Sequence, residues 1–171
     1  ADHRYLHSFP TRRSSDLMEF GTPVTLLRLN YAVELRYGVL VDIAVKVRDG
    51  VPVDLSMGFV NIVWQGYANS VCFRSLGICS APPRILNLTG PETLRVRDLA
   101  VEFGKRLGRE PVLTGDEQAT ALLSNAADCH RTFGMPDVGV DELIGWVADW
   151  VGEGGELLGK PTKFQVRDGK F

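Results

Sequence analysis

The chain has 171 residues, of which 44% are hydrophobic and 23% charged, with a formal net charge of −2; these values are ordinary for one globular domain. The charge gives no basic footprint for nucleic acid or an anionic membrane, and no run of about 18 apolar residues predicts a membrane helix. The three cysteines, Cys72, Cys79 and Cys129, lack metal-ligand spacing and are odd in number. We therefore expect reduced thiols, buried as small hydrophobes, in a cytoplasmic protein.

The first seventeen residues show neither helical nor strand periodicity, and no apolar segment follows their basic pair as it would in a secretory signal. Residues 7–17, HSFPTRRSSDL, resemble the in-frame translation of a sequencing adapter. A mitochondrial presequence is the alternative, although no amphipathic face develops. We expect residues 1–17 to be a disordered, non-native scar that contributes nothing to the fold.

An apolar strand over residues 24–33, VTLLRLNYAV, is the first clear element. It is apolar on both faces, which is typical of a strand covered on both sides in a parallel α/β sheet. From residue 38 the period changes to that of a helix, which Gly50 is well placed to end. Residues 18–50 therefore predict one strand–helix unit of a parallel sheet.

A second set of short strands and helices is predicted within residues 51–151. Strands are expected over residues 51–55, 59–64 and 84–89, and helices over residues 66–77, 96–107, 125–133 and 141–151. The helix over 96–107 is the clearest, since its apolar residues recur at i, i+3, i+4, i+7 and i+11. Thr93 and Ser124 are the nearest capping residues for two of these helices, and Cys72 and Leu76 are expected to point inward.

The last segment, residues 152–171, starts with a glycine-rich linker and continues as a basic tail, GKPTKFQVRDGKF. We expect this tail to be extended and to lie on the surface. Its basic residues, Lys160, Lys163, Arg167 and Lys170, are interpreted as a solvated face rather than as an anion site.

Motifs for catalysis and cofactor binding are missing from the sequence. It contains no G-x-G-x-x-G, no Walker A loop and no G-x-S-x-G elbow. No tyrosine is followed four residues later by a lysine, so there is no Tyr-x-x-x-Lys proton relay. His130 is interpreted as a solvated or capping residue. We assign no catalytic, cofactor-binding or metal-binding residue to this chain.

Polar residues at strand ends are the candidates for ligand binding. Arg28 and Asn30 are two residues apart and so share one face of a strand, and open α/β sheets bind ligands beyond the carboxyl ends of their strands. Trp64 and Gln65, at the end of a later strand, would line the same cleft. The alternatives are an ion pair for Arg28, a loop-tying role for Asn30 and a core position for Trp64.

Four segments carry, in order, a resemblance to a known family: LLRLNYAV, FVNIVW, LNLTGPETLRVRDLAVEFGKRLG and SNAADCHRTFGMPDVGVDELIGWVADWV. Over residues 21–171 the chain resembles the C-terminal part of an NAD-dependent epimerase/dehydratase, an extended short-chain dehydrogenase/reductase. The resemblance implies an N-terminal Rossmann domain that carries the glycine-rich NAD loop and the catalytic Tyr and Lys, all upstream of Val24. Residues 18–50 would then be a remnant of that domain, and residues 51–151 a substrate-binding subdomain.

Several positions differ from the family pattern. Members commonly have Arg-x-x-Asn on the strand, whereas Asn30 follows Arg28 by only two residues, and alignment on Arg28 puts Tyr31 at the Asn position. A shift of one residue moves a side chain to the opposite face, so Asn30 and Tyr31 are alternative substrate contacts. Tyr67 stands where the following helix often has Asp. The arginines that members acting on nucleotide sugars usually offer are absent from VPVDLSMGF and PVLTGDE, which weakens a nucleotide-sugar substrate.

These observations predict an incomplete α/β fold, made of a late Rossmann strand–helix unit and a small C-terminal α/β substrate domain. The expected function is the substrate-binding portion of an NAD(P)-dependent epimerase/dehydratase, inactive alone, with these candidate contacts: Arg28, Asn30, Tyr31, Trp64 and Gln65. NAD or NADP is expected in the full-length parent and not in this chain alone. The ligand would be a sugar-like or other hydroxy or carbonyl compound.

The alternative function is a non-catalytic module that binds a small ligand or a protein. No nucleic-acid or membrane partner is expected. The exposed edge of the strand over residues 24–33 predicts aggregation or pairing into a homodimer.

Overall fold

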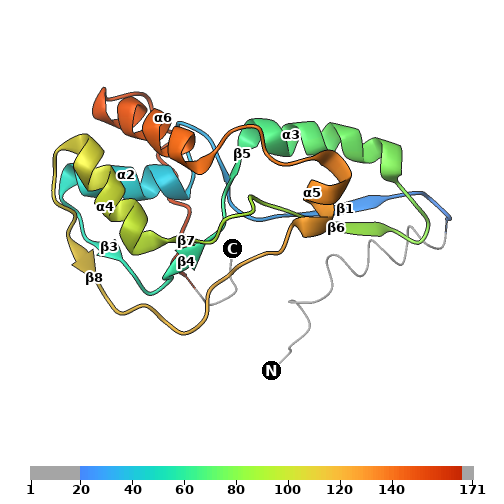
Figure 1. Cartoon of the computed structure of the whole chain (residues 1–171), viewed down its shortest axis with the longest axis horizontal. Helices are drawn as coiled ribbons and strands as arrows, with labels where there is room; N and C mark the ends of the chain where they lie inside the picture. Colours follow the sequence, from blue (N-terminus) through green and yellow to red (C-terminus); the bar gives the residue numbers. More distant parts are fainter. Residues whose placement is uncertain (1–19, 167–171) are drawn as a thin grey trace.

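A computed structural model describes residues 20–166, so the predictions for residues 1–17, Arg167 and Lys170 lie outside the described residues. The elements form two lobes (Figure 1). In chain order they are β1 (Thr25–Leu29), β2 (Ala32–Val33), α2 (Val39–Asp49), β3 (Val53–Asp54), β4 (Phe59–Val60), β5 (Val63–Trp64), α3 (Gln65–Arg74), the 3-10 helix η1 (Ser75–Ile78), β6 (Arg84–Leu88), β7 (Leu94–Arg95), α4 (Val96–Leu107), β8 (Leu113–Thr114), α5 (Ala127–Phe133) and α6 (Val140–Gly152).

The larger lobe is built on α2, α4 and α6, which gather at the left of Figure 1. Their apolar stripes meet in one core, where Leu40, Ile43, Phe103 and Val147 are almost completely buried. The three predicted helices in this lobe are confirmed. Gly50, at φ 68°, ends α2 in the left-handed conformation, which glycine adopts without a steric penalty.

The smaller lobe is built on β1 and β6, with α3, η1 and α5 packed beside them (Figure 1). β1 and β6 run parallel over their full length, which confirms the predicted parallel pairing and the strand over residues 84–89. Val71, Leu88 and Cys129 form a second, separate core. This core is small compared with that of the larger lobe.

The strand predicted over residues 24–33 is interrupted. β1 ends at Leu29, and the chain turns at Tyr31, whose φ of 46° is incompatible with an extended strand. β1 then pairs with β6, whereas β2 pairs with β5. The expectation of cover on both faces is also wrong, because Arg28 and Leu29 are exposed.

The strand predicted over residues 59–64 is divided in the same way. β4 pairs antiparallel with β7, and β5 pairs parallel with β2. Between them lies Asn61, buried and held by side-chain hydrogen bonds instead of a strand ladder. A buried polar side chain must find such partners, and here they come from two loops rather than from a neighbouring strand.

Other local predictions need correction. α3 gives way to η1 at Ser75, and this tighter winding rotates Leu76 outward, where it is 73% exposed. Cys72 lies on the flank of the face that buries Ala68 and Val71, so it is exposed; Cys79 is half-buried and only Cys129 is buried.

The predicted helix caps are not formed by the expected side chains. α4 begins after Arg95 without a side-chain cap, so Thr93 does not act as one. α5 starts at Ala127 rather than residue 125, and the Ala127 N–H donates to Asn125 Oδ1 at 2.9 Å, in place of the expected Ser124 cap.

The tail does not lie entirely on the surface. Phe164 is 2% exposed and belongs to the core of the larger lobe. The hydroxyl of Thr162 donates to Asp42 Oδ2 on α2 at 2.6 Å. The apolar side chain of Phe164 therefore anchors a segment that composition alone would place in solvent.

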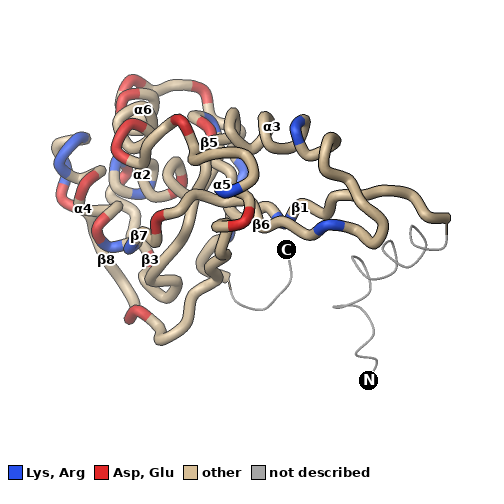
Figure 2. The backbone as a smooth tube through the Cα atoms, turned by 45° about the vertical axis from the view of Figure 1, so that its right-hand side comes forward, with Lys and Arg blue, Asp and Glu red and all other residues tan. Residues whose placement is uncertain are grey.

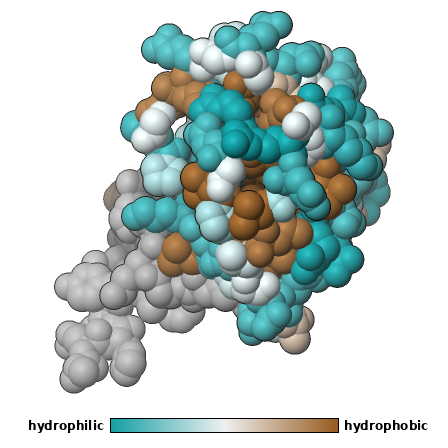
Figure 3. All heavy atoms as spheres, turned by 90° about the vertical axis from the view of Figure 1, so that its left-hand side faces the viewer, coloured by the Kyte–Doolittle hydropathy of each residue, from teal (hydrophilic) through white to brown (hydrophobic). Residues whose placement is uncertain are grey.

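Most charged residues lie on the larger lobe, with acidic positions along α6, whereas β1, β6 and α3 carry few (Figure 2). Seen from the end that carries α4 and β8, hydrophobic side chains reach the surface between hydrophilic ones (Figure 3). Val101 on α4 and Val112 before β8 are among the exposed apolar residues. Within residues 20–166, no helix is both long and apolar enough to cross a lipid bilayer.

Candidate functional site

The carboxyl ends of β1 and β6 lie together at the junction of the two lobes. Leu29 is opposite Leu88 in the parallel register, and the Asn30 N–H donates to the Leu88 carbonyl at 3.0 Å. In open α/β sheets this edge is where ligands bind. Thr89 and Gly90, which follow β6, therefore stand at the expected position of a cleft.

Asn61 forms hydrogen bonds with three segments at this edge. It is 4% exposed, and its Oδ1 accepts from the Ser124 N–H at 2.8 Å and from Asn30 Nδ2 at 3.4 Å. Its Nδ2 donates to the carbonyl of Glu92 at 3.3 Å. Sequence reasoning missed Asn61, although a polar residue inside the apolar segment FVNIVW was the available signal.

A hollow of about 500 Å³ opens beside Asn61. Its lining is rich in small polar groups and includes Asn61, Gly90, Thr93, Ser124, Asn125 and His130. Amide, hydroxyl and imidazole groups can both donate and accept hydrogen bonds. Such a lining suits a ligand with several hydroxyl groups.

His130 contacts the backbone at the same edge. Its Nε2 lies 2.9 Å from the carbonyl oxygen of Thr89. A carbonyl can only accept, so Nε2 is the donor in this contact. The Thr89 hydroxyl is buried and has no hydrogen-bond partner among the described residues, which leaves an uncompensated polar group one residue before Gly90.

Gly90 permits the close approach of two chain segments at the hollow. Its N–H donates to the Ile62 carbonyl at 2.9 Å, and a Cβ at this position would lie 2.1 Å from the same oxygen. Any side chain there would push β6 and the 61–62 segment apart. The shape of the hollow therefore depends on this glycine.

The candidates on the first strand separate in the structure. Asn30 reaches Asn61 and the Leu122 carbonyl, so its amide ties loops together. Arg28 is exposed on β1. Tyr31 turns away toward the larger lobe, where its hydroxyl donates to the Phe164 carbonyl at 3.4 Å, and burial raises the pKa of its phenol.

The two candidates at the end of β5 serve different contacts. Trp64 packs edge-to-face on Trp146, with ring centroids 5.6 Å apart, and lines a smaller hollow that shares Gly90 and Pro91 with the polar one. Gln65 Nε2 donates to Asn69 Oδ1 on its own helix at 2.9 Å. The five predicted contacts are thus not brought into one site, and of these only Asn30 bonds to a residue lining the polar hollow.

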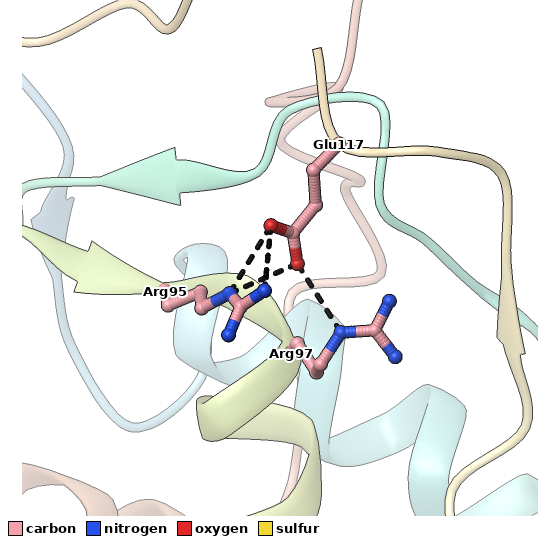
Figure 4. Close-up of polar contacts among 3 residues, drawn as sticks. All are labelled: Arg95, Arg97 and Glu117. Carbon is pink, nitrogen blue, oxygen red and sulfur yellow. Dashed lines mark hydrogen bonds and ion pairs between the residues drawn. The ribbon is translucent and has the colours of Figure 1, made fainter. Parts of the chain in front are cut away.

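Two arginines that sequence reasoning did not select lie near the 115–117 loop (Figure 4). Glu117 accepts from Arg95 Nη2 at 3.0 Å and from Arg97 Nε at 3.2 Å. These bonds, chiefly the one from Arg95, hold the pKa of Glu117 below its ordinary range. Arginines therefore bind Glu117, which follows the Gly115–Asp116 pair in sequence, but they come from β7 and α4 rather than from the expected segments.

Tyr67 and Cys129 occupy the core of the smaller lobe. The Tyr67 hydroxyl donates to the Gly134 carbonyl at 2.6 Å, and burial, with a contribution from Cys129, raises the pKa of Tyr67 to about 12. Burial likewise raises the pKa of the Cys129 thiol. Neither group is poised to exchange protons near neutral pH.

Among residues 20–166 we find neither a phosphate-binding loop nor a metal-binding cluster. The strand-to-helix connections before α2, α3 and α4 carry no glycine-rich phosphate loop. Within residues 20–166, no group of His, Cys, Asp or Glu side chains is arranged to hold a metal. The site is thus a polar hollow lined by amide, hydroxyl and imidazole groups.

Comparisons with known proteins identify the fold. No protein-family model matches the sequence, and no curated protein matches it. Among solved structures, a UDP-glucose 4-epimerase from Thermus thermophilus in complex with NAD matches with a TM-score of 0.67 at 19% identity over 83% of this chain. A UDP-glucose 4-epimerase from Thermotoga maritima with UDP-glucose gives a TM-score of 0.67 at 14% identity over 84% of this chain.

A UDP-glucuronic acid 4-epimerase from Bacillus cereus, in complex with NAD and a fluorinated UDP-glucuronic acid, gives a TM-score of 0.69 at 11% identity over 84% of this chain. In all three cases the chain spans 50% of the solved structure. The chain therefore has a partial Rossmann-like epimerase fold, which confirms the predicted incomplete α/β architecture.

Proposed function

We propose that this chain is the substrate-binding portion of an NAD(P)-dependent epimerase/dehydratase and is inactive alone. The observation that carries the proposal is the polar hollow at the carboxyl ends of the parallel β1–β6 pair, where this class of fold binds ligands. The fold likeness to UDP-sugar 4-epimerases supports it. NAD or NADP would be held by a part of the parent enzyme with no counterpart among the described residues.

The proposed ligand is a sugar-like hydroxy compound, recognised by its hydroxyl groups. Ser124, Asn125 and His130 line the hollow, and the Nε2 atom of His130 is engaged with the Thr89 carbonyl. Our first probe is UDP-glucose, which is present in the Thermotoga maritima structure. Arg95 and Arg97 offer a positive surface for its diphosphate only if Glu117 releases them.

Calorimetric titration of the whole chain with UDP-glucose, and separately with glucose, tests the proposal. We expect Ser124→Ala to weaken binding about three- to tenfold, because one hydrogen bond is worth about 0.5–1.5 kcal/mol. The matched control, Ser70→Ala, changes an exposed serine of α3 and should bind as the parent chain does. Equal affinities for the two variants, no binding of either sugar, or turnover of NAD(H) by the chain alone would refute the proposal.

A second candidate is a non-catalytic binding module, which the closed core of the larger lobe favours. Such a module would be a monomer with one cooperative thermal transition. The fragment proposal instead expects self-association through the free edge of β1, which pairs with β6 alone among the described strands. Size-exclusion chromatography separates the two: a monomer at all concentrations favours the module, and a concentration-dependent dimer or aggregate favours the fragment.

A further inference from the structure

A second hollow lies between α2 and the tail, and its lining comes from segments before and after those that line the polar hollow. It measures about 260 Å³ and shares no lining residue with the hollow at the β1–β6 edge. One wall is the side of α2 that carries the buried Val41 and the half-buried Val45, and the other wall is the segment 157–165. The opposite face of α2, with Leu40, Ile43 and Val47, is buried in the core.

The tail is fixed in place at three points. The Leu158 N–H donates to the Arg36 carbonyl at 3.1 Å. The N–H and hydroxyl of Thr162 both donate to Asp42 Oδ2, at 2.7 and 2.6 Å. Phe164 is buried in the core. The wall is thus preformed, so a ligand would not have to order it at an entropic cost.

Basic side chains dominate the charged lining of this hollow. Four basic residues line it: Arg36, Lys46, Lys160 and Lys163. Arg36 pairs with Glu34 at 3.1 Å, but within residues 20–166 no ion pair engages the three lysines. Asp42 is the one acidic residue among those lining it, and its Oδ2 already accepts two hydrogen bonds from Thr162. The lining therefore carries a net positive charge, since Asp42 offsets only one of its four basic residues.

The floor beneath these charges is apolar. Tyr37, Val41, Val45 and Leu157 contribute it. An apolar floor with a basic rim matches a ligand that has an anionic group on an apolar body, because the body leaves water while the anion faces several cations. A bare inorganic anion would use only the rim.

We propose that the hollow between α2 and the tail binds an organic anion, in which a phosphate or carboxylate group is attached to an apolar or aromatic body. Lys46, Lys160 and Lys163 face the anion, and Tyr37 with Val41 and Val45 contacts the body. This site is separate from the proposed sugar site and does not depend on it. It reverses the interpretation of the tail lysines as a solvated face.

Amide NMR spectra of the whole chain, recorded during titration with phenyl phosphate, test the proposal. Saturable shifts are expected for Val41, Val45, Lys46 and Gly159, with none at Gly90 or Ser124 of the other hollow. Benzoate shows whether a carboxylate replaces the phosphate. Phenol and inorganic phosphate each lack one half of the recognised ligand, so both should bind at least tenfold more weakly. Phenol that binds as tightly as phenyl phosphate, or shifts spread over the surface, would overturn the proposal.

Charge variants provide an independent check. Lys46→Gln and Lys160→Gln should each raise the Kd for phenyl phosphate about fivefold, as expected for a partly exposed charge pair worth about 1 kcal/mol. The control, Lys105→Gln, removes a lysine from α4 that pairs with Glu102 and should leave the Kd unchanged. Added salt should weaken binding to the parent chain and affect the Lys46→Gln variant less. Equal affinities for Lys46→Gln and Lys105→Gln would contradict the site.

Discussion

The two lobes of this molecule differ in how completely they bury their own apolar surface. In the larger lobe three helices enclose a continuous core, and residues such as Phe103 and Val147 are almost inaccessible. In the smaller lobe the core is confined to a few side chains, while Leu29 and Ile85 on β1 and β6 are 52% and 48% exposed. The larger lobe encloses its core, and the smaller lobe presents a sheet edge and face that the described residues leave uncovered.

The largest effect is expected from a pair of phenylalanine substitutions, one in each lobe. Phe103→Ala on α4 should lower the free energy of unfolding by about 3–5 kcal/mol, because it opens a cavity in a closed core. Phe73→Ala on α3, where the ring is 77% exposed, should change it by less than about 0.5 kcal/mol. Urea unfolding of both variants measures the difference. A loss for Phe73→Ala as large as that for Phe103→Ala would contradict the exposure of the Phe73 ring.

A glycine pair tests the junction between the lobes. Gly90→Ala should cost about 1–3 kcal/mol, because its new methyl group collides with the Ile62 carbonyl and overpacks the polar hollow. Gly77→Ala in η1 has no atom within 4 Å of the added carbon and should be neutral or stabilising by up to about 1 kcal/mol. Thermal unfolding followed by circular dichroism distinguishes them. A neutral Gly90→Ala would show that the junction can relax without that close contact.

The smallest effect concerns the exposed Arg95–Glu117–Arg97 cluster of the larger lobe. Folding lowers the pKa of Glu117, chiefly through the hydrogen bond from Arg95. The ionised Glu117 carboxylate therefore stabilises the fold at pH values above its unfolded pKa of about 4.3. This stabilisation is lost as the pH falls through the lower pKa of the folded state. Glu117→Gln should melt slightly earlier than the parent at neutral pH and together with it at strongly acidic pH. Glu110→Gln, at an exposed glutamate after α4, is the control; an unchanged difference at every pH would contradict this sign.

The helices of the larger lobe could be predicted from sequence because each one carries a regular apolar stripe and two of them end at glycine. The strands could not, since their limits depend on distant partners. The first predicted strand is interrupted at Tyr31, although the apolar run contains no Gly or Pro that would predict a turn. The strand over residues 59–64 is interrupted at Asn61, whose side chain forms hydrogen bonds with the loops at Glu92 and Ser124. The same long-range contacts build the polar hollow. Its residues come from separate segments, so no local motif marks them.

The anchoring of the tail could not be predicted from the sequence for a similar reason. Phe164 lies in a segment of basic and small residues, and only the fold shows that α2 and the core offer it a place. The Thr162–Asp42 contact joins residues 120 positions apart. Sequence periodicity reports the faces of single elements and carries no information on such pairings.

We propose that the polar hollow binds a sugar-like ligand and that the chain does not catalyse the reaction of that ligand. Amide NMR spectra of the whole chain during titration with UDP-glucose test it most directly. We predict saturable shifts at Asn61, Gly90, Ser124 and Asn125, unchanged signals along α6, and an unaltered sugar after incubation with NAD. Shifts confined to other surfaces, no shifts at all, or conversion of the sugar by this chain would contradict it.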